Sequence, residues 1–289
     1  MKESLYILQT GLLWRLYLAF QAPIPLESVC CLAPYAIATV SRAIRSESEV
    51  DLKPATFAEY TVADQRRMTR ARRYFEWQYQ LANSKLGKRV LEIGAGIGNF
   101  TQYLLERELV VAIDVQPECI VQLQRRFSDR INLISKTMDA QDPEFLSLKV
   151  LRIDSIACLN VLEHVKNDDL LLLGMGEILP PGGKVVLILP AFQALYGPID
   201  RNLGHYRRYS KRLLAEKAAH AGLAPKILRY MNSVGAIGWW VNAKLLRMTE
   251  QSESQIAFFD SAIVPVLSRL EEVVHPPFGQ SLFAVLEKP

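Results

Sequence analysis

The stretch Val90-Leu-Glu-Ile-Gly-Ala-Gly-Ile-Gly-Asn-Phe100 carries the strongest structural signal in this chain. A short apolar run contains one acid, Glu92, and leads into glycines at positions 94, 96 and 98. Glycine permits a tight turn and lets a ligand approach the backbone, and a helix that begins after the turn offers unpaired N–H groups. The stretch therefore predicts a strand, a ligand-binding turn and a helix.

Strand-like and helix-like patterns alternate on both sides of this turn. The predicted strands are residues 89–93, 109–113, 131–134, 155–159, 184–189, 226–230 and 281–286. The predicted helices include one that follows the glycine turn and ends at residue 105, and those at 117–127 and 211–220. Short β-rich runs separated by helices are typical of crossover units and of a parallel sheet covered on both faces. The fold class is therefore α/β, with Ser210 as the cap of the last of these helices.

The spacing of the glycines indicates the kind of ligand. Dinucleotide sites use G-x-G-x-x-G, whereas this turn reads G-x-G-x-G and follows Glu92, an acid that would repel a pyrophosphate. Asp114 ends the next predicted strand, where a carboxylate accepts hydrogen bonds from both ribose hydroxyls. A cationic, nucleotide-like cofactor fits this site better than NAD does.

At this point the chain resembles the class I S-adenosylmethionine-dependent methyltransferases, whose first motif has the same acid-x-G-x-G-x-G form. Three more motifs follow in the family's order, namely Met138-Asp139, Asn160-Val-Leu-Glu-His-Val165 and Leu179-Pro-Pro-Gly-Gly-Lys-Val-Val-Leu-Ile188, and the resemblance covers about residues 70–289. It implies a Rossmann-like three-layer sandwich with a seven-stranded, mostly parallel sheet. It also implies S-adenosyl-L-methionine as cofactor and S-adenosyl-L-homocysteine as product.

The resemblance carries cofactor contacts to individual positions. Turn residues would line the methionine part, residues after the second strand would hold the ribose and adenine, and residues after the third and fourth strands would complete the site. The implied cofactor-binding residues are Glu92, Gly94, Ala95, Gly96, Gly98, Asn99, Asp114, Val115, Met138, Asp139 and Asn160.

Acceptor chemistry is expected after the fourth and fifth strands, at the carboxyl edge of the sheet. The candidate catalytic residues are Glu163, His164, His205 and Tyr206, and each histidine has the alternative of orienting or packing its loop. The candidate substrate residues are Tyr196, Asp200, Arg207, Trp239, Trp240, Arg73 and Tyr74, and the two tryptophans have the alternative of ordinary core. Methyl transfer demands no metal, and the four cysteines show no metal-ligand spacing, so no metal site is predicted.

The chain divides into an N-terminal helical extension, residues 1–54, and a cofactor-binding domain, residues 55–289. The apolar extension fits core packing, a lid over the substrate, a homodimer interface or an interfacial helix. Its apolar run from Leu5 to Phe20 contains Gln9 and Arg15 and is too short to span a bilayer. We therefore expect a cytoplasmic protein without a signal peptide, with peripheral membrane contact left open.

Composition and charge indicate which classes of substrate the chain can bind. The chain has 289 residues, 50% of them hydrophobic, and a net charge of +4, which is too small an excess to indicate nucleic-acid binding. Arginines 66, 70 and 73 recur at helical spacing on one helix predicted over residues 64–77, with Asp64 as its N-cap, and they form either a solvated face or a clamp for an anionic acceptor. A small or lipid-like acceptor fits best, methylated on carbon or oxygen: an aromatic, quinone, isoprenoid or polyketide-like natural product. The alternatives are an RNA or protein methyltransferase, a non-catalytic interaction protein that keeps the cofactor fold, and an NAD-dependent oxidoreductase.

Overall fold

Seven strands form one sheet in the part of the chain that the computed structural model describes, residues 57–250 and 252–289. They are β1 (Arg89–Ile93), β2 (Leu109–Asp114), β3 (Leu133–Thr137), β4 (Ser155–Leu159), β5 (Lys184–Pro190), β6 (Ala224–Met231) and β7 (Ser281–Glu287). Their order is β3-β2-β1-β4-β5-β7-β6, with β7 antiparallel to both of its neighbours and the other pairs parallel. The predicted Rossmann-like, mostly parallel sheet is confirmed, while the predicted extension, 1–54, lies outside the described residues.

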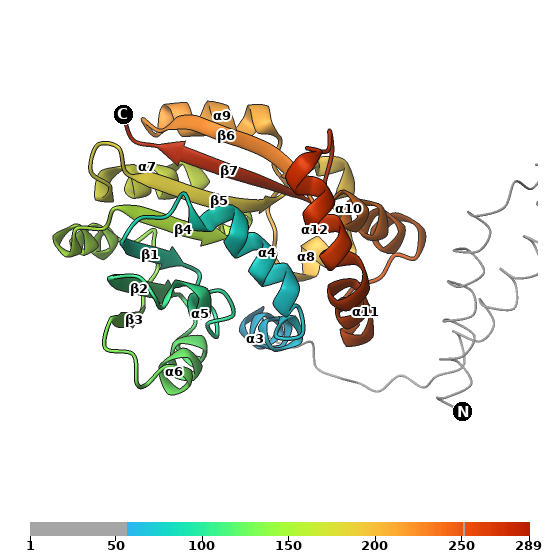
Figure 1. Cartoon of the computed structure of the whole chain (residues 1–289), viewed down its shortest axis with the longest axis horizontal. Coiled ribbons are helices and arrows are strands. Elements are labelled where there is room, and N and C mark those ends of the chain that lie inside the picture. Colours follow the sequence, from blue (N-terminus) through green and yellow to red (C-terminus); the bar gives the residue numbers. More distant parts are fainter. Residues whose placement is uncertain (1–56, 251) are drawn as a thin grey trace, which may run out of the picture. The chain divides into compact units, whose positions relative to one another are not determined.

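Helices cover both faces of this sheet (Figure 1). The α-helices are α3 (Phe57–Met68), α4 (Arg72–Asn83), α5 (Thr101–Leu104), α6 (Pro117–Arg126), α7 (Asp168–Ile178), α8 (Pro198–Asn202), α9 (Lys211–His220), α10 (Ser233–Trp240), α11 (Glu253–Phe258) and α12 (Val264–Val273). Short 3-10 helices are η2 (Pro143–Leu151), η3 (Leu162–His164) and η4 (Gln193–Leu195), and π-helical turns are η5 (Val241–Leu245) and η6 (Phe259–Ile263). None of the helices in the described ranges is long and apolar enough to cross a lipid bilayer.

The strands are apolar on both faces because each face packs against helices. In β1, Val90 belongs to the core shared with α4, α5 and α12, whereas Leu91 belongs to the core shared with α7 and α9. This alternation is what a parallel strand buried on both faces requires. Glu92 interrupts the apolar pattern although it is only 3% exposed, which marks it for a role other than packing.

Three predicted boundaries were wrong, and one of them is the start of β6, which lies at Ala224 rather than at residue 226. The third strand begins at Leu133 rather than at residue 131, since Asn132 donates to backbone carbonyls of the loop before β2 and Ile131 is fully exposed. The helix predicted from Asp64 onward is two helices, α3 and α4, separated by a turn in which the Thr69 hydroxyl bonds to the carbonyl oxygen of Arg66. Asp64 lies inside α3 and is not its cap.

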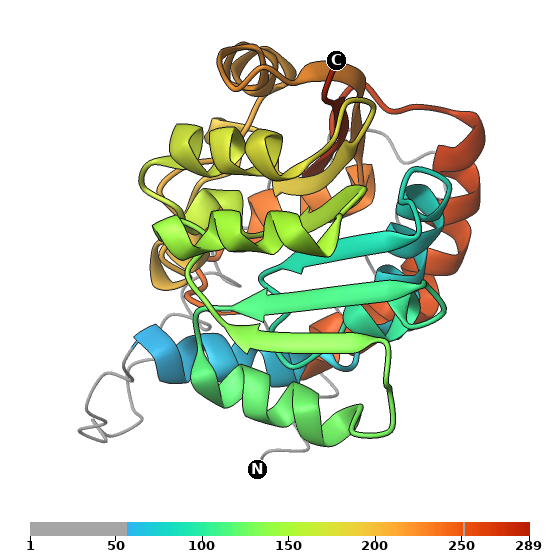
Figure 2. The same cartoon turned by 90° about the vertical axis from the view of Figure 1, so that its left-hand side faces the viewer.

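The order of the strands reverses between β1 and β4, and ligands of open α/β sheets bind at the carboxyl ends of strands at such a point. Figure 2 shows β1, β2 and β3 side by side, with α3, in blue, near their arrowheads. The glycine turn follows β1 and η3 follows β4 at this edge. The topology therefore brings the cofactor motif and the predicted acceptor segment to neighbouring positions.

Candidate active site

The glycine turn after β1 has the backbone that its sequence predicts. Gly94, Gly96 and Gly98 have φ angles of +75°, +54° and +86°, a region that side chains with a Cβ rarely occupy. A Cβ at Gly94 would overlap the Val161 side chain, and one at Gly98 would lie 2.5 Å from a ring carbon of Phe127. Gly94 therefore lets the turn pack closely on the segment after β4, while Gly98 lets it pack on α6.

Asp114 ends β2 beside this turn. Its Oδ2 accepts a hydrogen bond from the amide of Gly96 at 2.8 Å, and its Oδ1 accepts one from the amide of Gln116 at 2.8 Å. Burial raises the pKa of Asp114, and these backbone bonds oppose that effect. Each carboxylate oxygen can accept a second bond, so the pair suits the two hydroxyls of a ribose.

Helix α3 contributes a residue that the sequence did not single out. The Asn99 amide donates to the backbone oxygen of Gln65 at 2.9 Å, and a Cβ on Gly96 would lie 2.7 Å from Gln65 Oε1. Gln65 thus contacts the glycine turn directly. The sequence predicted a helix around Gln65, but helical periodicity alone does not show which side chain of the helix faces the glycine turn.

Glu92 is buried without a matching cation among the described residues. No described residue donates a hydrogen bond to its Oε2. Burial raises its pKa to about 8; the Thr101 hydroxyl lowers the pKa and the charge of Asp114 raises it further. A buried acid of this kind is costly for a fold alone and suits a positively charged ligand group.

The remaining positions implied for the cofactor lie along the same strand ends. Met138 is buried and its amide donates to the Asp114 carbonyl at 2.9 Å, whereas Val115 is 54% exposed. Asp139 accepts from the amide of Gln141 in the turn after β3. Asn160 has a φ of +52° directly after β4, and its amide donates to the carbonyl of Ile188; Ala95 is buried at the turn.

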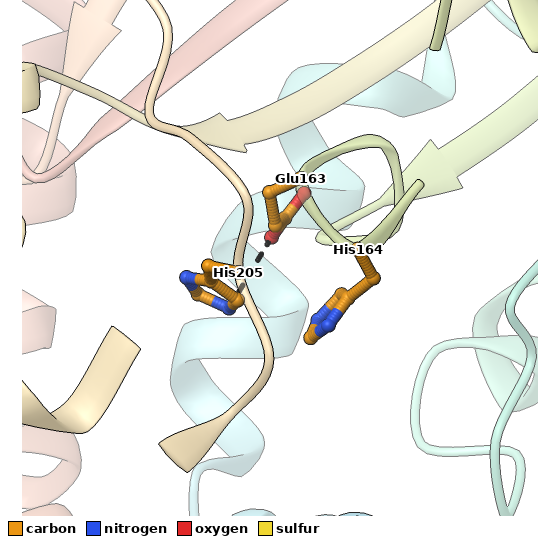
Figure 3. Close-up of side chains that lie close together, drawn as sticks. All are labelled: Glu163, His164 and His205. Atoms are coloured by element: carbon orange, nitrogen blue, oxygen red, sulfur yellow. Dashed lines mark ion pairs between the residues drawn. The ribbon is translucent and has the colours of Figure 1, made fainter. Parts of the chain in front are cut away.

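Three catalytic candidates come together near the end of β4 (Figure 3). Glu163 and His164 lie in η3, and His205 comes from the loop after α8. His205 Nε2 is 4.0 Å from Glu163 Oε1, and the two imidazole rings meet edge to face with centroids 4.6 Å apart. Burial raises the pKa of Glu163 to about 7, with the charge of His205 opposing it, and burial lowers the pKa of His164 to about 3.

Asp200 sets the orientation of His205. Its Oδ1 lies 2.9 Å from His205 Nδ1 and 2.8 Å from Arg208 Nε, and its Oδ2 accepts the amide of Gly197. Burial tends to raise the pKa of Asp200, but the bonds from His205 and Arg208 outweigh it and hold the pKa below its usual range. Since the ionised carboxylate only accepts, Nδ1 carries a hydrogen, and in the neutral form of the ring Nε2 has the lone pair and faces Glu163.

A second buried acid holds the rest of the same loop. Asp168 is 1% exposed and forms contacts with Arg207, with the Tyr209 hydroxyl at 2.7 Å and with Lys217 at 2.9 Å. Arg207 thus pairs with Asp168, and Arg208 rather than Arg207 pairs with Asp200. The sequence did not mark Asp168, because three partners from distant segments meet on it only in the fold.

The other substrate candidates are spread over the surroundings. The Tyr196 hydroxyl donates to the carbonyl of His205, and Tyr206 is 54% exposed while its amide donates to the carbonyl of Glu163. Trp239 is buried under the Arg208 guanidinium, 4.7 Å from the ring centroid, whereas Trp240 is 51% exposed.

The predicted arginine stripe is split, since Arg66 lies in α3, Arg70 in the turn after it and Arg73 in α4, and of these three arginines Arg70 and Arg73 contact the helical insertion between β6 and β7. Arg70 pairs with Glu253 at 2.8 Å, and Arg73 donates to the carbonyl of Ser261 at 3.1 Å. The backbone amide of Tyr74 donates to Asp260 in the same insertion. These contacts give the stripe internal partners.

Comparisons with known proteins agree with this geometry. A family model described as a methyltransferase domain matches residues 62–226. The ubiquinone biosynthesis O-methyltransferase of Coxiella burnetii is 26% identical over 134 residues, which cover 46% of this chain and 51% of that protein. The probable polyketide synthase 40 of Dictyostelium discoideum is 27% identical over 137 residues, which cover 40% of this chain and 5% of that protein.

A solved structure supports the fold. The structure of a putative methyltransferase of Haloferax volcanii, in complex with the Trm112 methyltransferase activator, matches with a TM-score of 0.55 at 17% identity, over 82% of this chain and 100% of that one. The curated relatives are matched over about half of their length or less. The family model, in contrast, covers more than half of this chain and includes the glycine turn, Asp114 and the Glu163 segment. The chain therefore belongs to the methyltransferase domain family, within the class I S-adenosylmethionine-dependent methyltransferases.

Proposed function

We propose that the chain transfers a methyl group from S-adenosylmethionine to a hydroxyl oxygen of a small, largely apolar acceptor. The observation that carries this proposal is the close approach of Gly94 to Val161, two residues before Glu163. This contact supports a cofactor position near the cluster of one carboxyl and two imidazole groups. Methyl donor and proton acceptor would then lie side by side.

The residues at the turn fit the cofactor. Glycines with positive φ leave the backbone open to close approach, and Asp114 has acceptor capacity for a ribose. The Glu92 carboxylate suits the cationic methionine end of the ligand. When bound, S-adenosylmethionine supplies a methyl group on a positively charged sulfur.

Proton removal falls to the cluster after β4. In the proposed reaction the acceptor oxygen forms a bond to the methyl carbon while the carbon–sulfur bond breaks, and its electron pair returns to sulfur. The hydroxyl proton passes to His205 Nε2, whose ring Asp200 orients through Nδ1. Glu163 lies beside that nitrogen and stabilises the imidazolium that forms.

The acceptor class is inferred from the relatives and from the insertion between β6 and β7. One curated relative carries the name of a ubiquinone O-methyltransferase and another that of a polyketide synthase. Trp240, Phe258 and Phe278 are exposed on or next to that insertion. A phenolic, quinone-like or polyketide-like acceptor suits such surfaces.

We also propose that residues 1–54 form an extension separate from the methyltransferase domain, residues 55–289, and serve acceptor binding. A chain lacking residues 1–54 should bind S-adenosylhomocysteine as the full chain does and lose affinity for the acceptor. Loss of both would show that the extension is required for folding instead.

The decisive assay uses the full chain with methyl-labelled S-adenosylmethionine and a panel of catechols, hydroxylated quinol precursors and hydroxylated polyketides. We expect label in a small molecule, identified by mass spectrometry, and a thermal stabilisation by S-adenosylhomocysteine but not by NADH. Label recovered in RNA or protein would favour the macromolecular alternatives. Absence of stabilisation by S-adenosylhomocysteine would overturn the proposal.

A matched pair of variants tests the proton acceptor. His205→Ala should lower turnover at saturating acceptor by roughly 10²–10⁴-fold, the usual contribution of a general base. His220→Ala, an exposed histidine on α9, is the control and should keep full activity. Equal turnover in both variants would assign His205 to packing.

A further inference from the structure

The cluster after β4 also has the composition of a metal site. Glu163, His164 and His205 each offer one ligand atom, and these atoms lie within 4.8 Å of one another. We propose that the three side chains bind a single divalent transition-metal ion, of the class of Zn²⁺, Mn²⁺ or Fe²⁺. Figure 3 shows Glu163 directed toward His205, with His164 beside them.

The carboxylate of Glu163 is the first argument. Glu163 is fully buried, and no other residue in the described ranges donates a hydrogen bond to either of its oxygens. Buried polar groups in folded proteins are nearly always satisfied, and an unsatisfied buried carboxylate is among the most costly. A cation between Glu163 and the two imidazoles would give the carboxylate a partner of opposite charge.

The orientation of His205 is the second argument. Metal-bound histidines usually donate their other ring N–H to a carboxylate, which directs the lone pair to the metal. His205 has that arrangement, because its Nδ1 bonds to Asp200 at 2.9 Å and its Nε2 lies 4.0 Å from Glu163. Asp200 is itself held by Arg208 and by the amide of Gly197, so the imidazole is rigidly positioned.

The ligand set selects the kind of metal. Two imidazoles with one carboxylate, the set offered here, suit transition metals such as zinc and iron. Mg²⁺ and Ca²⁺ prefer sites made of oxygen atoms alone. Nitrogen and oxygen ligands bind such ions at about 2.1 Å, so two ligand atoms are at most about 4.2 Å apart. The observed separations of up to 4.8 Å exceed this limit by about 0.6 Å, so binding requires the side chains to turn toward the ion. Three protein ligands leave coordination positions open, as in catalytic sites.

The catalytic consequence rests on the proposed function, whereas the binding does not. An acceptor hydroxyl at an open position would lose its proton to solvent more easily, because a bound divalent metal lowers the pKa of oxygen ligands. The resulting oxyanion takes the methyl carbon, and the electron pair of the broken carbon–sulfur bond stays on sulfur. In the metal-bound enzyme His205 is then a ligand and no longer the base.

The experiment measures metal binding without turnover. The full chain is stripped with a chelator and titrated with Co²⁺, followed by calorimetry and by visible absorption of the bound ion. We expect one equivalent per chain with bands typical of nitrogen and oxygen ligands. Glu163→Gln should weaken Co²⁺ binding by at least roughly 10-fold, while His220→Ala leaves it unchanged.

Asp200→Asn tests the positioning role, with an expected loss of roughly 10–100-fold in Co²⁺ affinity. Each variant is checked for retained binding of S-adenosylhomocysteine, and His205→Gln replaces Glu163→Gln if the latter loses it. Substoichiometric Co²⁺, equal affinity in Glu163→Gln and the unmodified chain, or a thiolate-to-cobalt charge-transfer band would overturn the metal site. Metal binding without methyl transfer to any acceptor would leave the site standing and overturn the proposed function.

Discussion

Glu92→Gln provides a direct test of the buried acid at the cofactor turn. Burial raises the pKa of Glu92 from 4.5 to about 8. Between these pH values the folded chain without cofactor holds a proton that the unfolded chain has released, so raising the pH favours unfolding. Each pH unit contributes about 1.4 kcal/mol, which makes the loss about 3 kcal/mol between pH 4.5 and 7.

The substituted amide keeps the shape of the side chain and has no proton to lose. Relative to the unmodified chain, Glu92→Gln should therefore gain about 3 kcal/mol of unfolding free energy over this interval, levelling off above pH 8. Urea unfolding at half-unit pH steps, without cofactor, measures the difference between the two chains. Glu177→Gln, an exposed position on α7, is the control and should run parallel to the unmodified chain.

The affinity of Glu92→Gln for S-adenosylmethionine provides a second, independent measurement. Glu92→Gln should bind S-adenosylmethionine more weakly although its fold is more stable, because the cationic end of the ligand loses its buried carboxylate. Stability curves of Glu92→Gln and the unmodified chain that stay parallel from pH 4.5 to 8 would refute the reasoning. Unchanged cofactor affinity would remove Glu92 from the site.

Two more predictions follow from the same contacts. Gly96→Ala and Gly182→Ala both place a Cβ at positive φ, and each should lose about 1–2 kcal/mol of unfolding free energy. Only the new Cβ at position 96 would also contact Gln65, so calorimetry should find weakened S-adenosylhomocysteine binding in Gly96→Ala alone. Equal affinities of the two variants would contradict this prediction. In the metal-free chain, Asp200→Ala should lower the unfolding free energy, measured with urea, by roughly 3–5 kcal/mol, because it leaves the buried Arg208 guanidinium without its carboxylate partner. In the same metal-free chain, Glu163→Gln should keep or raise the unfolding free energy, because the Glu163 carboxyl receives no hydrogen bond from another described residue. The opposite ranking would refute the roles assigned to the two acids.

Local patterns were sufficient to predict the glycine turn and the position of Asp114 at the end of the next strand. The apolar strand, the spaced glycines and Asp114 lie within 25 residues of one another, and each is required by backbone geometry or by ligand chemistry that short sequences display. The positive φ angles of all three glycines bear out the predicted turn. The ends of the strands were harder to predict from local patterns. The start of β3, for example, depends on hydrogen bonds from the Asn132 side chain to the loop before β2.

The acceptor half of the candidate site could not be predicted from local patterns, because its residues come from segments far apart in the sequence. The sequence named Glu163, His164 and His205 as separate candidates, and His205 lies 42 positions after Glu163. His205 points at Glu163 because Asp200 binds the other nitrogen of its ring. The loop that carries His205 is held in place by the contacts of Asp168 with Arg207, Tyr209 and Lys217. No spacing rule predicts such pairings, because side chains from different loops meet only when the sheet has aligned its strand ends.

By itself the sequence determined the class of fold and the positions of its main strands along the chain, and it indicated a cationic, nucleotide-like cofactor, since hydrophobic periodicity and a glycine turn are local properties of the chain. Only the tertiary structure decided that α3 presents Gln65 to the cofactor turn, that Arg208 rather than Arg207 pairs with Asp200, and that a carboxyl and two imidazoles form one cluster. The physical reason is that burial and charge pairing depend on contacts across the sheet. Those contacts turn an ordinary Glu163 into a buried acid with its pKa raised to about 7.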